Sequence, residues 1–158
     1  MAGHAATSES MRNENQSSSG LSFRVGKRFH RLGNRLRRNA THLFLLSPPL
    51  CGSTAIAELI HTSPAVTVFP NSGEGQFLQE ARPILLVDER WNPELSVDWE
   101  RIRSIYCSYW SPLKPVRFEK SPPNLVRAEA LQCHFHDAHF ILTLRNPYAQ
   151  IEGMLRRG

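Results

Sequence analysis

Cysteine is scarce in this chain of 158 residues and forms no recognisable pattern. The three cysteines, Cys51, Cys107 and Cys133, are widely spaced and odd in number, so they predict neither a disulfide framework nor a CxxC zinc pair. No stretch approaches eighteen apolar residues, and the first ten residues lack the basic start and apolar run of a secretory signal. These absences predict a cytoplasmic protein with no transmembrane segment.

Acidic residues are few in the first part of the chain. Residues 1–40 contain eight Lys or Arg and two acids, whereas residues 41–158 contain eleven basic and twelve acidic residues. The basic excess therefore belongs to the tail, and it gives no reason to expect that the folded part binds nucleic acid.

Large apolar residues are almost missing from residues 1–20, which are rich in Ser, Asn and Gly and are predicted to be disordered. Residues 21–38 are different, because apolar residues recur at spacings of three and four among basic ones and predict a short basic amphipathic helix. The helix is interpreted as a solvated basic linker, with a membrane-surface or organelle-targeting segment as the alternative. Its apolar residues are Leu21, Val25, Phe29, Leu32 and Leu36.

Apolar runs and turn residues predict one α/β domain over residues 41–158. Short apolar runs bounded by proline or glycine are typical of buried strands, and apolar residues three or four apart indicate helices. The alternation of the two predicts a parallel sheet flanked by helices on both faces. Strands are expected at 42–47, 65–69, 116–119 and 139–144, and helices at 53–61, 74–81, 99–109, 124–133 and 148–156, with 82–115 otherwise irregular.

The segment from Ser47 to Thr54 joins the first expected strand to the first helix and contains no lysine. Gly52 allows close backbone approach, the helix N-terminus favours an anion, and Ser53 and Thr54 supply hydroxyls, so a phosphate-binding loop is expected. The loop lacks the early Gly and the Lys of a GxxxxGK[ST] motif, which disfavours ATP or GTP hydrolysis. The alternative is an ordinary strand-to-helix turn with Ser53 as N-cap.

Three motifs together resemble the sulfotransferase superfamily, which uses 3′-phosphoadenosine 5′-phosphosulfate (PAPS). Pro49-Leu50-Cys51-Gly52-Ser53-Thr54 is similar to the family's 5′-phosphosulfate loop, P-[RK]-[ST]-G-[ST]-T. FILTLRNP, with Arg145, is similar to the strand end that binds the cofactor's 3′-phosphate, and Glu119-Lys120-Ser121-Pro122 to the EK[ST]P segment of carbohydrate- and peptide-directed members. The resemblance covers residues 42–157 and implies a P-loop-NTPase-like sulfotransferase fold.

The chain departs from the family's pattern at three positions. Leu50 stands where the family has Arg or Lys, and Cys51 replaces a hydroxyl residue. Gly153 stands eight residues after Arg145, where the family has Ser. Family domains continue well beyond the 3′-phosphate strand, so the sequence is expected to represent the N-terminal half of such a domain, incomplete at its C-terminus.

The resemblance implies roles for individual residues. Pro49, Cys51, Gly52, Ser53, Thr54 and Arg145 would bind PAPS, with Arg145 on the 3′-phosphate. Glu74 would be the catalytic base, and Lys120 would neutralise charge on the transferred sulfonyl group. The alternatives are a solvent-facing Glu74 at a helix start and a surface Lys120 paired with Glu119.

No metal is expected, because Cys133, His134, His136, Asp137 and His139 lie around a turn from which their side chains should diverge. The predicted function is transfer of a sulfonyl group from PAPS to a hydroxyl or amine of a carbohydrate, peptide or small molecule. The main alternative is a non-catalytic nucleotide- or anion-binding module of the same fold. A small-molecule kinase is disfavoured by the missing loop lysine, and an interaction protein acting through the basic tail remains a further alternative.

Overall fold

The computed structural model describes residues 40–70 and 72–156. The predictions for residues 1–20 and for the basic amphipathic segment 21–38 lie outside these residues. Within the described part no helix is long and apolar enough to cross a membrane.

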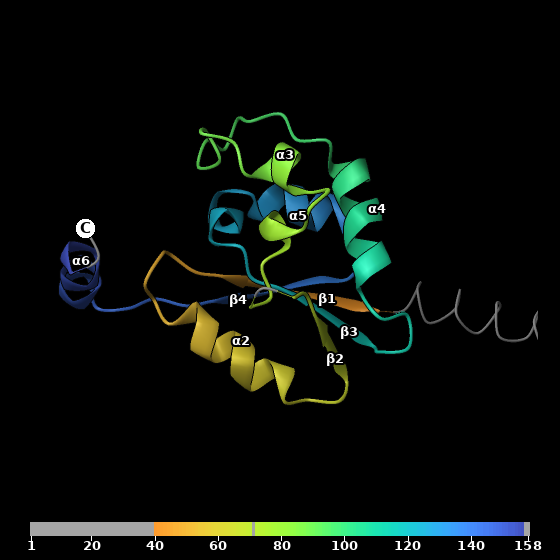
Figure 1. Cartoon of the computed structure of the whole chain (residues 1–158), viewed down its shortest axis with the longest axis horizontal. Coiled ribbons are helices and arrows are strands. Elements are labelled where there is room, and N and C mark those ends of the chain that lie inside the picture. Colours follow the sequence, from red (N-terminus) through yellow and green to blue (C-terminus); the bar gives the residue numbers. More distant parts are fainter. Residues whose placement is uncertain (1–39, 71, 157–158) are drawn as a thin grey trace, which may run out of the picture. The chain divides into compact units, whose positions relative to one another are not determined.

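A four-stranded, all-parallel sheet forms the centre of the α/β domain, which confirms the predicted class (Figure 1). The strands are β1 (Thr41–Leu46), β2 (Val66–Val68), β3 (Val116–Glu119) and β4 (Ala138–Leu142), in the order β2-β3-β1-β4. The central strand β1 pairs with β3 on one side and with β4 on the other. The carboxyl ends of the strands therefore meet at one edge, where ligands bind in open α/β sheets.

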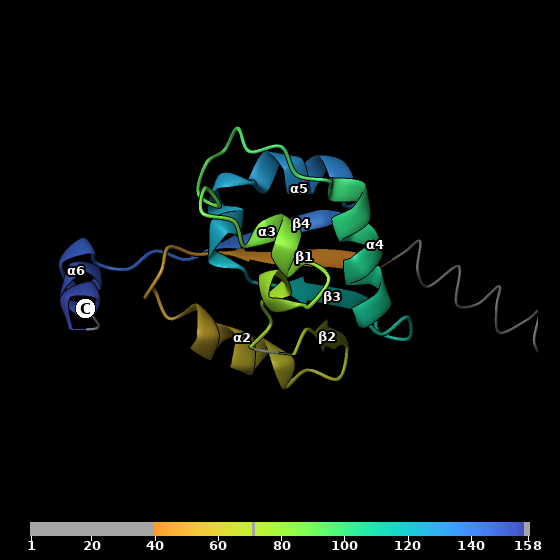
Figure 2. The same ribbon diagram turned by 45° about the horizontal axis from the view of Figure 1, so that its top comes forward.

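Helices flank both faces of the sheet. Figures 1 and 2 show α2 (Ser53–His61) on one face, and α3 (Arg82–Leu85), α4 (Trp99–Tyr109) and α5 (Ala128–His134) on the other. Side chains alternate along β1, so Leu45 packs with Ala57 of α2 while Phe44 packs with the core beneath α4 and α5. The arrangement explains why β1 is an almost continuous apolar run rather than an alternating one.

Aromatic rings fill the core beneath α4 and α5. Phe69 stacks on Trp110 with ring centroids 4.7 Å apart, and Phe44 meets Phe135 edge to face at 5.2 Å. Each such buried ring contributes about 1.5–3 kcal/mol relative to an exposed one. Tyr106 of α4 packs against both Phe69 and Trp110, which attaches this helix to the sheet.

Two predicted helices are wrong in extent. The segment expected to be helical over 74–81 contains only a 3-10 turn, η1 (Gly75–Phe77), and a further short helix, α3, follows inside the stretch expected to be irregular. The helix expected over 124–133 begins at Ala128 and is preceded by a 3-10 turn, η2 (Pro122–Val126). In both places a group bonds to Glu119 of β3 instead: the Gly75 N–H to Oε1 and Asn124 Nδ2 to Oε2.

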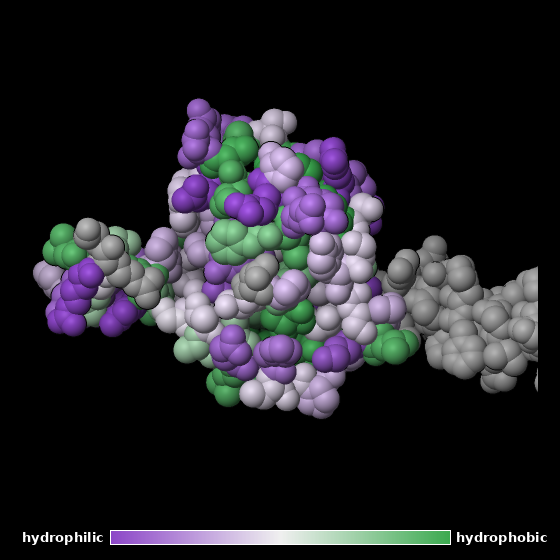
Figure 3. Space-filling model, in the orientation of Figure 1, coloured by the Kyte–Doolittle hydropathy of each residue, from purple (hydrophilic) through white to green (hydrophobic). Residues whose placement is uncertain are grey.

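The last helix, α6 (Pro147–Leu155), follows β4 through an extended segment and lies beyond the carboxyl ends of the strands (Figure 1). Its side chains Tyr148 and Leu155 are exposed, as are Leu59 of α2 and Leu144. Figure 3 shows hydrophobic side chains scattered among hydrophilic ones over the face turned to the viewer.

Candidate functional site

The loop between β1 and α2 is held in a shape that depends on left-handed backbone at two residues. Leu50 has φ 62° and Gly52 has φ 86°, and an added Cβ at Gly52 would meet nothing within 4 Å. Ser47, at the end of β1, is fully buried, and its hydroxyl donates to the carbonyl of Pro48. Gly52 therefore has the left-handed backbone that favours glycine, whereas no neighbouring atom approaches it closely.

The N-terminus of α2 carries no side-chain cap. Gly52 is the N-cap, Ser53 is the first helical residue, and no acidic residue lies in the first turn. The alternative interpretation of Ser53 as N-cap is therefore wrong. The first N–H groups of a helix need an acceptor from outside the helix, and their partial positive charge favours an anion.

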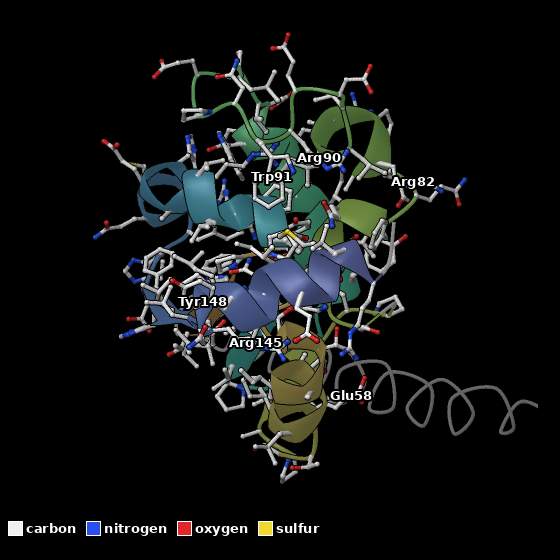
Figure 4. All side chains as sticks on the ribbon, turned by 90° about the vertical axis from the view of Figure 1, so that its left-hand side faces the viewer. Glu58, Arg82, Arg90, Trp91, Arg145 and Tyr148 are labelled. Atoms are coloured by element: carbon white, nitrogen blue, oxygen red, sulfur yellow. The ribbon has the colours of Figure 1, made fainter. Side chains whose placement is uncertain are left out.

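Residues that follow β4 bind the carbonyl groups of this loop. Arg145 Nη1 donates to the Leu50 carbonyl at 3.0 Å, and Gln150 Nε2 of α6 donates to the Pro49 carbonyl at 2.9 Å. Figure 4 looks onto this edge of the sheet and shows Arg145 between α6 and α2. Arg145 thus lies next to the loop, as expected, but its guanidinium contacts loop backbone and is otherwise exposed.

Glu74 and Lys120 form a buried ion pair beside the start of α2. Lys120 Nζ lies 2.7 Å from Glu74 Oε1, and the two side chains are 2% and 15% exposed. The same nitrogen donates to Thr54 Oγ1 at 3.1 Å, and Gln76 Nε2 donates to Glu74 Oε2 at 2.6 Å. Lys120 is therefore neither on the surface nor paired with Glu119, and Glu74 does not face solvent, so both alternative interpretations are wrong.

Glu119 is the centre of a second buried network, which includes the residues that directly follow Glu74 and Lys120. Its Oε1 accepts from the Gly75 N–H at 3.0 Å, from the Ser121 N–H at 2.9 Å and from the Ser121 hydroxyl, while its Oε2 accepts from Asn124 Nδ2. Gln76 N–H in turn donates to the Ser121 hydroxyl at 3.1 Å. Every oxygen of this carboxylate has a donor, which is the condition for burying a charge.

Burial raises the pKa of Glu119 to about 7, and the negative charge of Glu74 adds to the rise, while the Ser121 and Gly75 donors oppose it. Tyr106 and Arg127 are the other ionisable groups that interact with this carboxyl. Strongly shifted carboxyl groups cluster at functional sites, although structural networks also produce them.

The structure brings three of the predicted site residues into direct contact, namely Thr54, Glu74 and Lys120. Gly52 and Ser53 form the adjoining start of α2, and Pro49 and Cys51 belong to the loop before it. Arg145 reaches the loop from its other side and contacts Leu50. The chemistry available at this edge is therefore an anion-binding helix start, a buried ammonium group and a carboxylate that could accept a proton.

Sequence reasoning missed Glu119, Gln76 and Asn124 as parts of the site. The signal for Glu119 is its place beside Lys120 in the EKSP segment, which by itself suggests only a partner for the lysine. Alternation along an extended chain sends adjacent side chains to opposite faces, which separates Glu119 from Lys120. Nothing in the sequence indicates that Asn124 turns back to Glu119.

The turn that carries Asp137 has φ 55° at this residue, and Asp137 accepts hydrogen bonds from Thr41 and pairs with His139 at 3.0 Å. Among residues 40–70 and 72–156 no three His, Cys, Asp or Glu side chains are placed to hold a metal ion together.

Comparison with family models, with curated proteins and with solved structures finds no match to this chain. The interpretation of the site therefore depends on its geometry and on the motifs in the sequence.

Proposed function

We propose that residues 41–158 belong to a PAPS-dependent sulfotransferase domain of the P-loop-NTPase-like fold, which transfers a sulfonyl group from PAPS to a hydroxyl or amine acceptor. The observation that carries the proposal is the meeting of Lys120 with both Thr54 and Glu74. Thr54 and Lys120 come from two separate motifs and Glu74 from the segment after β2, and a lysine, a loop hydroxyl and a carboxylate at one sheet edge match the needs of sulfonyl transfer.

In this proposal the anionic end of PAPS lies against the start of α2. The uncapped N–H groups of α2 and the hydroxyls of Ser53 and Thr54 would bind the 5′-phosphosulfate. Arg145 would bind the 3′-phosphate by exchanging its contact with the Leu50 carbonyl for a charge-assisted one, which is the stronger of the two.

Glu74 and Lys120 would perform the transfer. Glu74 takes the proton from the acceptor hydroxyl, the acceptor oxygen forms a bond to sulfur, and the bond from sulfur to the phosphate oxygen breaks. Lys120 then stabilises the negative charge that develops on the leaving 3′-phosphoadenosine 5′-phosphate. In the absence of ligand the Lys120 and Glu74 side chains pair with each other beside the start of α2.

One observation favours a non-catalytic nucleotide-binding module as the second candidate. Leu50 replaces the loop cation of the family, and the family's serine position is Gly153, whose added Cβ would lie 3.6 Å from Leu50 Cδ1. The two departures therefore meet at one place in the structure. A missing electrostatic donor typically lowers a rate by about 10²–10³, so binding would persist where turnover is weak.

Calorimetry with 3′-phosphoadenosine 5′-phosphate and with ATP, both without magnesium, tests the proposal. We expect tighter binding of the first, because the loop has Arg145 beside it and no Walker lysine. Equal affinity or preference for ATP would refute the proposal. Transfer of labelled sulfonate from PAPS to a panel of sugars, peptides and phenols then separates an enzyme from a binding module.

A further inference from the structure

The Glu119 side chain joins the two segments that carry Glu74 and Lys120. Gly75 directly follows Glu74, and Ser121 directly follows Lys120. The backbone N–H groups of both donate to the same oxygen, Glu119 Oε1, at 3.0 and 2.9 Å. The carboxylate is completely buried, so it does not itself face an incoming ligand.

We propose that Glu119 is the positioning residue of this site: its carboxylate sets the distance between Glu74 and Lys120 by binding the peptide groups that follow them. The relevance of this role to sulfonyl transfer rests on the proposed function, whereas the effect on the ion pair does not.

The surroundings of Glu119 support a positioning role, because its other bonds hold the same two segments. The Ser121 hydroxyl donates to Glu119 and accepts from the Gln76 N–H, which makes a second bridge between the segments. The Lys120 N–H donates to the Gly73 carbonyl at 3.1 Å, one residue before Glu74. Glu74 itself lies outside the helices and strands, directly before η1, so these bonds replace the regular backbone bonds that would otherwise fix it.

The donor and the acceptor of the hydrogen bond between Asn124 and Glu119 can be exchanged by mutation. Asn124 Nδ2 donates to Glu119 Oε2. In Glu119→Gln the oxygen that binds Gly75 and Ser121 is retained, but an amide NH₂ faces the NH₂ of Asn124, which leaves two donors opposed. Adding Asn124→Asp restores one donor and one acceptor at this contact and keeps the total charge of the pair.

The reactivity of Lys120 toward an amine acylating reagent, measured by mass spectrometry on the folded full-length chain, tests the proposal without any ligand. We expect Glu119→Gln to raise the labelling rate of Lys120 by roughly tenfold to a hundredfold. One unsatisfied buried donor raises by that factor the fraction of molecules in which the site is open to the reagent. Lys114, which donates to the Val66 carbonyl at 2.7 Å, is the internal reference and should not change. The double variant Glu119→Gln/Asn124→Asp should return Lys120 to slow labelling, and Glu89→Gln, which removes an exposed charge, should match wild type.

Hydrogen exchange on the wild-type protein gives a second measurement that needs no variant. The amides of Gly75 and Ser121 should exchange as slowly as those of β3, because both are bonded to Glu119, although neither is bonded within a helix or a strand ladder. Fast exchange at both amides, or unchanged Lys120 labelling in a folded Glu119→Gln protein, would overturn the positioning role.

If wild type fails to bind 3′-phosphoadenosine 5′-phosphate while these results hold, the proposed function is wrong and the positioning role stands. If wild type is active, Glu119→Gln should lower kcat with little change in cofactor affinity, because the loop over 47–54 does not contact Glu119 by any hydrogen bond of the described residues.

Discussion

Lys120 Nζ lies 2.7 Å from Glu74 Oε1, and this ion pair joins the segments that follow β2 and β3. Both groups are largely shielded from water, so the cost of removing them from solvent is offset only while each keeps its partner. Thr54 and Gln76 provide the remaining hydrogen bonds, which ties the start of α2 to the same pair. A site built in this way is sensitive to loss of one member and more tolerant of loss of both.

Lys120→Met should destabilise the protein by about 3–5 kcal/mol, because it leaves the Glu74 carboxylate buried without its cation. Glu74→Gln should cost a similar amount, because it removes the charge that pairs with the buried Lys120 and turns an amide NH₂ toward either Lys120 or Gln76 Nε2. The double variant should cost clearly less than the sum, with a coupling of about 1–3 kcal/mol in a double-mutant cycle measured by urea unfolding.

The exposed pair of Glu100 and Arg103, at 2.7 Å, is the matched control for this cycle. Its coupling should not exceed about 0.5 kcal/mol, because water screens it. Additive costs at Glu74 and Lys120 would show that the two side chains do not depend on each other in solution.

The strands and several helices follow from the sequence because their patterns depend on local spacing and burial. The helix at 99–109 and the strand at 116–119 have the predicted bounds, and β1 lies within one residue of its predicted range. The strand order β2-β3-β1-β4 could not be predicted, because it depends on which strand each connection returns to.

The segment from Gly73 to Gln76 shows why part of the site could not be predicted. Its residues are compatible with a helix start, but Gly73 has φ 81° and the Gly75 N–H bonds to Glu119, which is 44 residues away in sequence. Tertiary bonds of this kind override local preference, and a sequence pattern carries no record of them. The contact of Lys120 with Glu74 instead of the adjacent Glu119 has the same cause.

Gly75→Ala should destabilise the protein by about 1–3 kcal/mol, since overpacking a filled site forces its neighbours to move. An added Cβ at Gly75 would lie 2.4 Å from Cζ and Oη of Tyr106, and that ring is buried in the core. The near-ultraviolet circular dichroism of the aromatic cluster should change as well, because Tyr106 packs on Trp110 with ring centroids 5.4 Å apart.

Gly52→Ala is the contrasting variant, because the space around this glycine is open and only its φ of 86° opposes a side chain. It should cost about 1 kcal/mol from backbone strain and leave the aromatic signal unchanged. An aromatic spectrum that is altered equally by both variants, or by neither, would contradict the close approach of Tyr106 to Gly75.

Leu50→Arg should tighten binding of 3′-phosphoadenosine 5′-phosphate by roughly tenfold to a hundredfold if the loop lacks only its cation, because a charge-assisted hydrogen bond contributes about 1.5–3 kcal/mol. Leu59→Arg on the exposed side of α2 introduces the same charge away from the loop and is the control. Calorimetry on both variants gives the comparison. Equal gains would show a general effect of added charge, and no gain at Leu50 would show that the loop does not bind this ligand.

Protonation of His42 should destabilise the protein in acid. His42 Nδ1 lies 2.6 Å from the His136 carbonyl and must donate to it, so Nε2 is left to accept from Arg117 Nη1 at 3.2 Å. A charged ring would lose this acceptor and oppose the arginine. Burial is the main cause that lowers the pKa of His42, with Arg117 adding to the effect, while the His136 carbonyl and Asp137 oppose it.

The sign of the pH dependence follows from this shift. Below the unfolded-state pKa of about 6.5 the unfolded chain takes up a proton that the folded His42 resists, so the free energy of unfolding falls as pH falls, with a limiting slope of about 1.4 kcal/mol per pH unit. Glu119 acts in the opposite direction: its pKa, raised to about 7, gives a contribution to stability that is present at low pH and lost as pH rises through 7.

Wild type must therefore be compared with a variant that changes only His42. His42→Gln keeps one donor and one acceptor without a titrating ring, and urea unfolding between pH 7.5 and 5.5 should show a shallower acid loss than in wild type. His61→Gln, at the exposed end of α2, should follow the wild-type curve. Parallel curves for wild type and His42→Gln would mean that His42 takes up a proton as readily in the folded state as in the unfolded state. That result would contradict the buried contact of the His42 ring with Arg117.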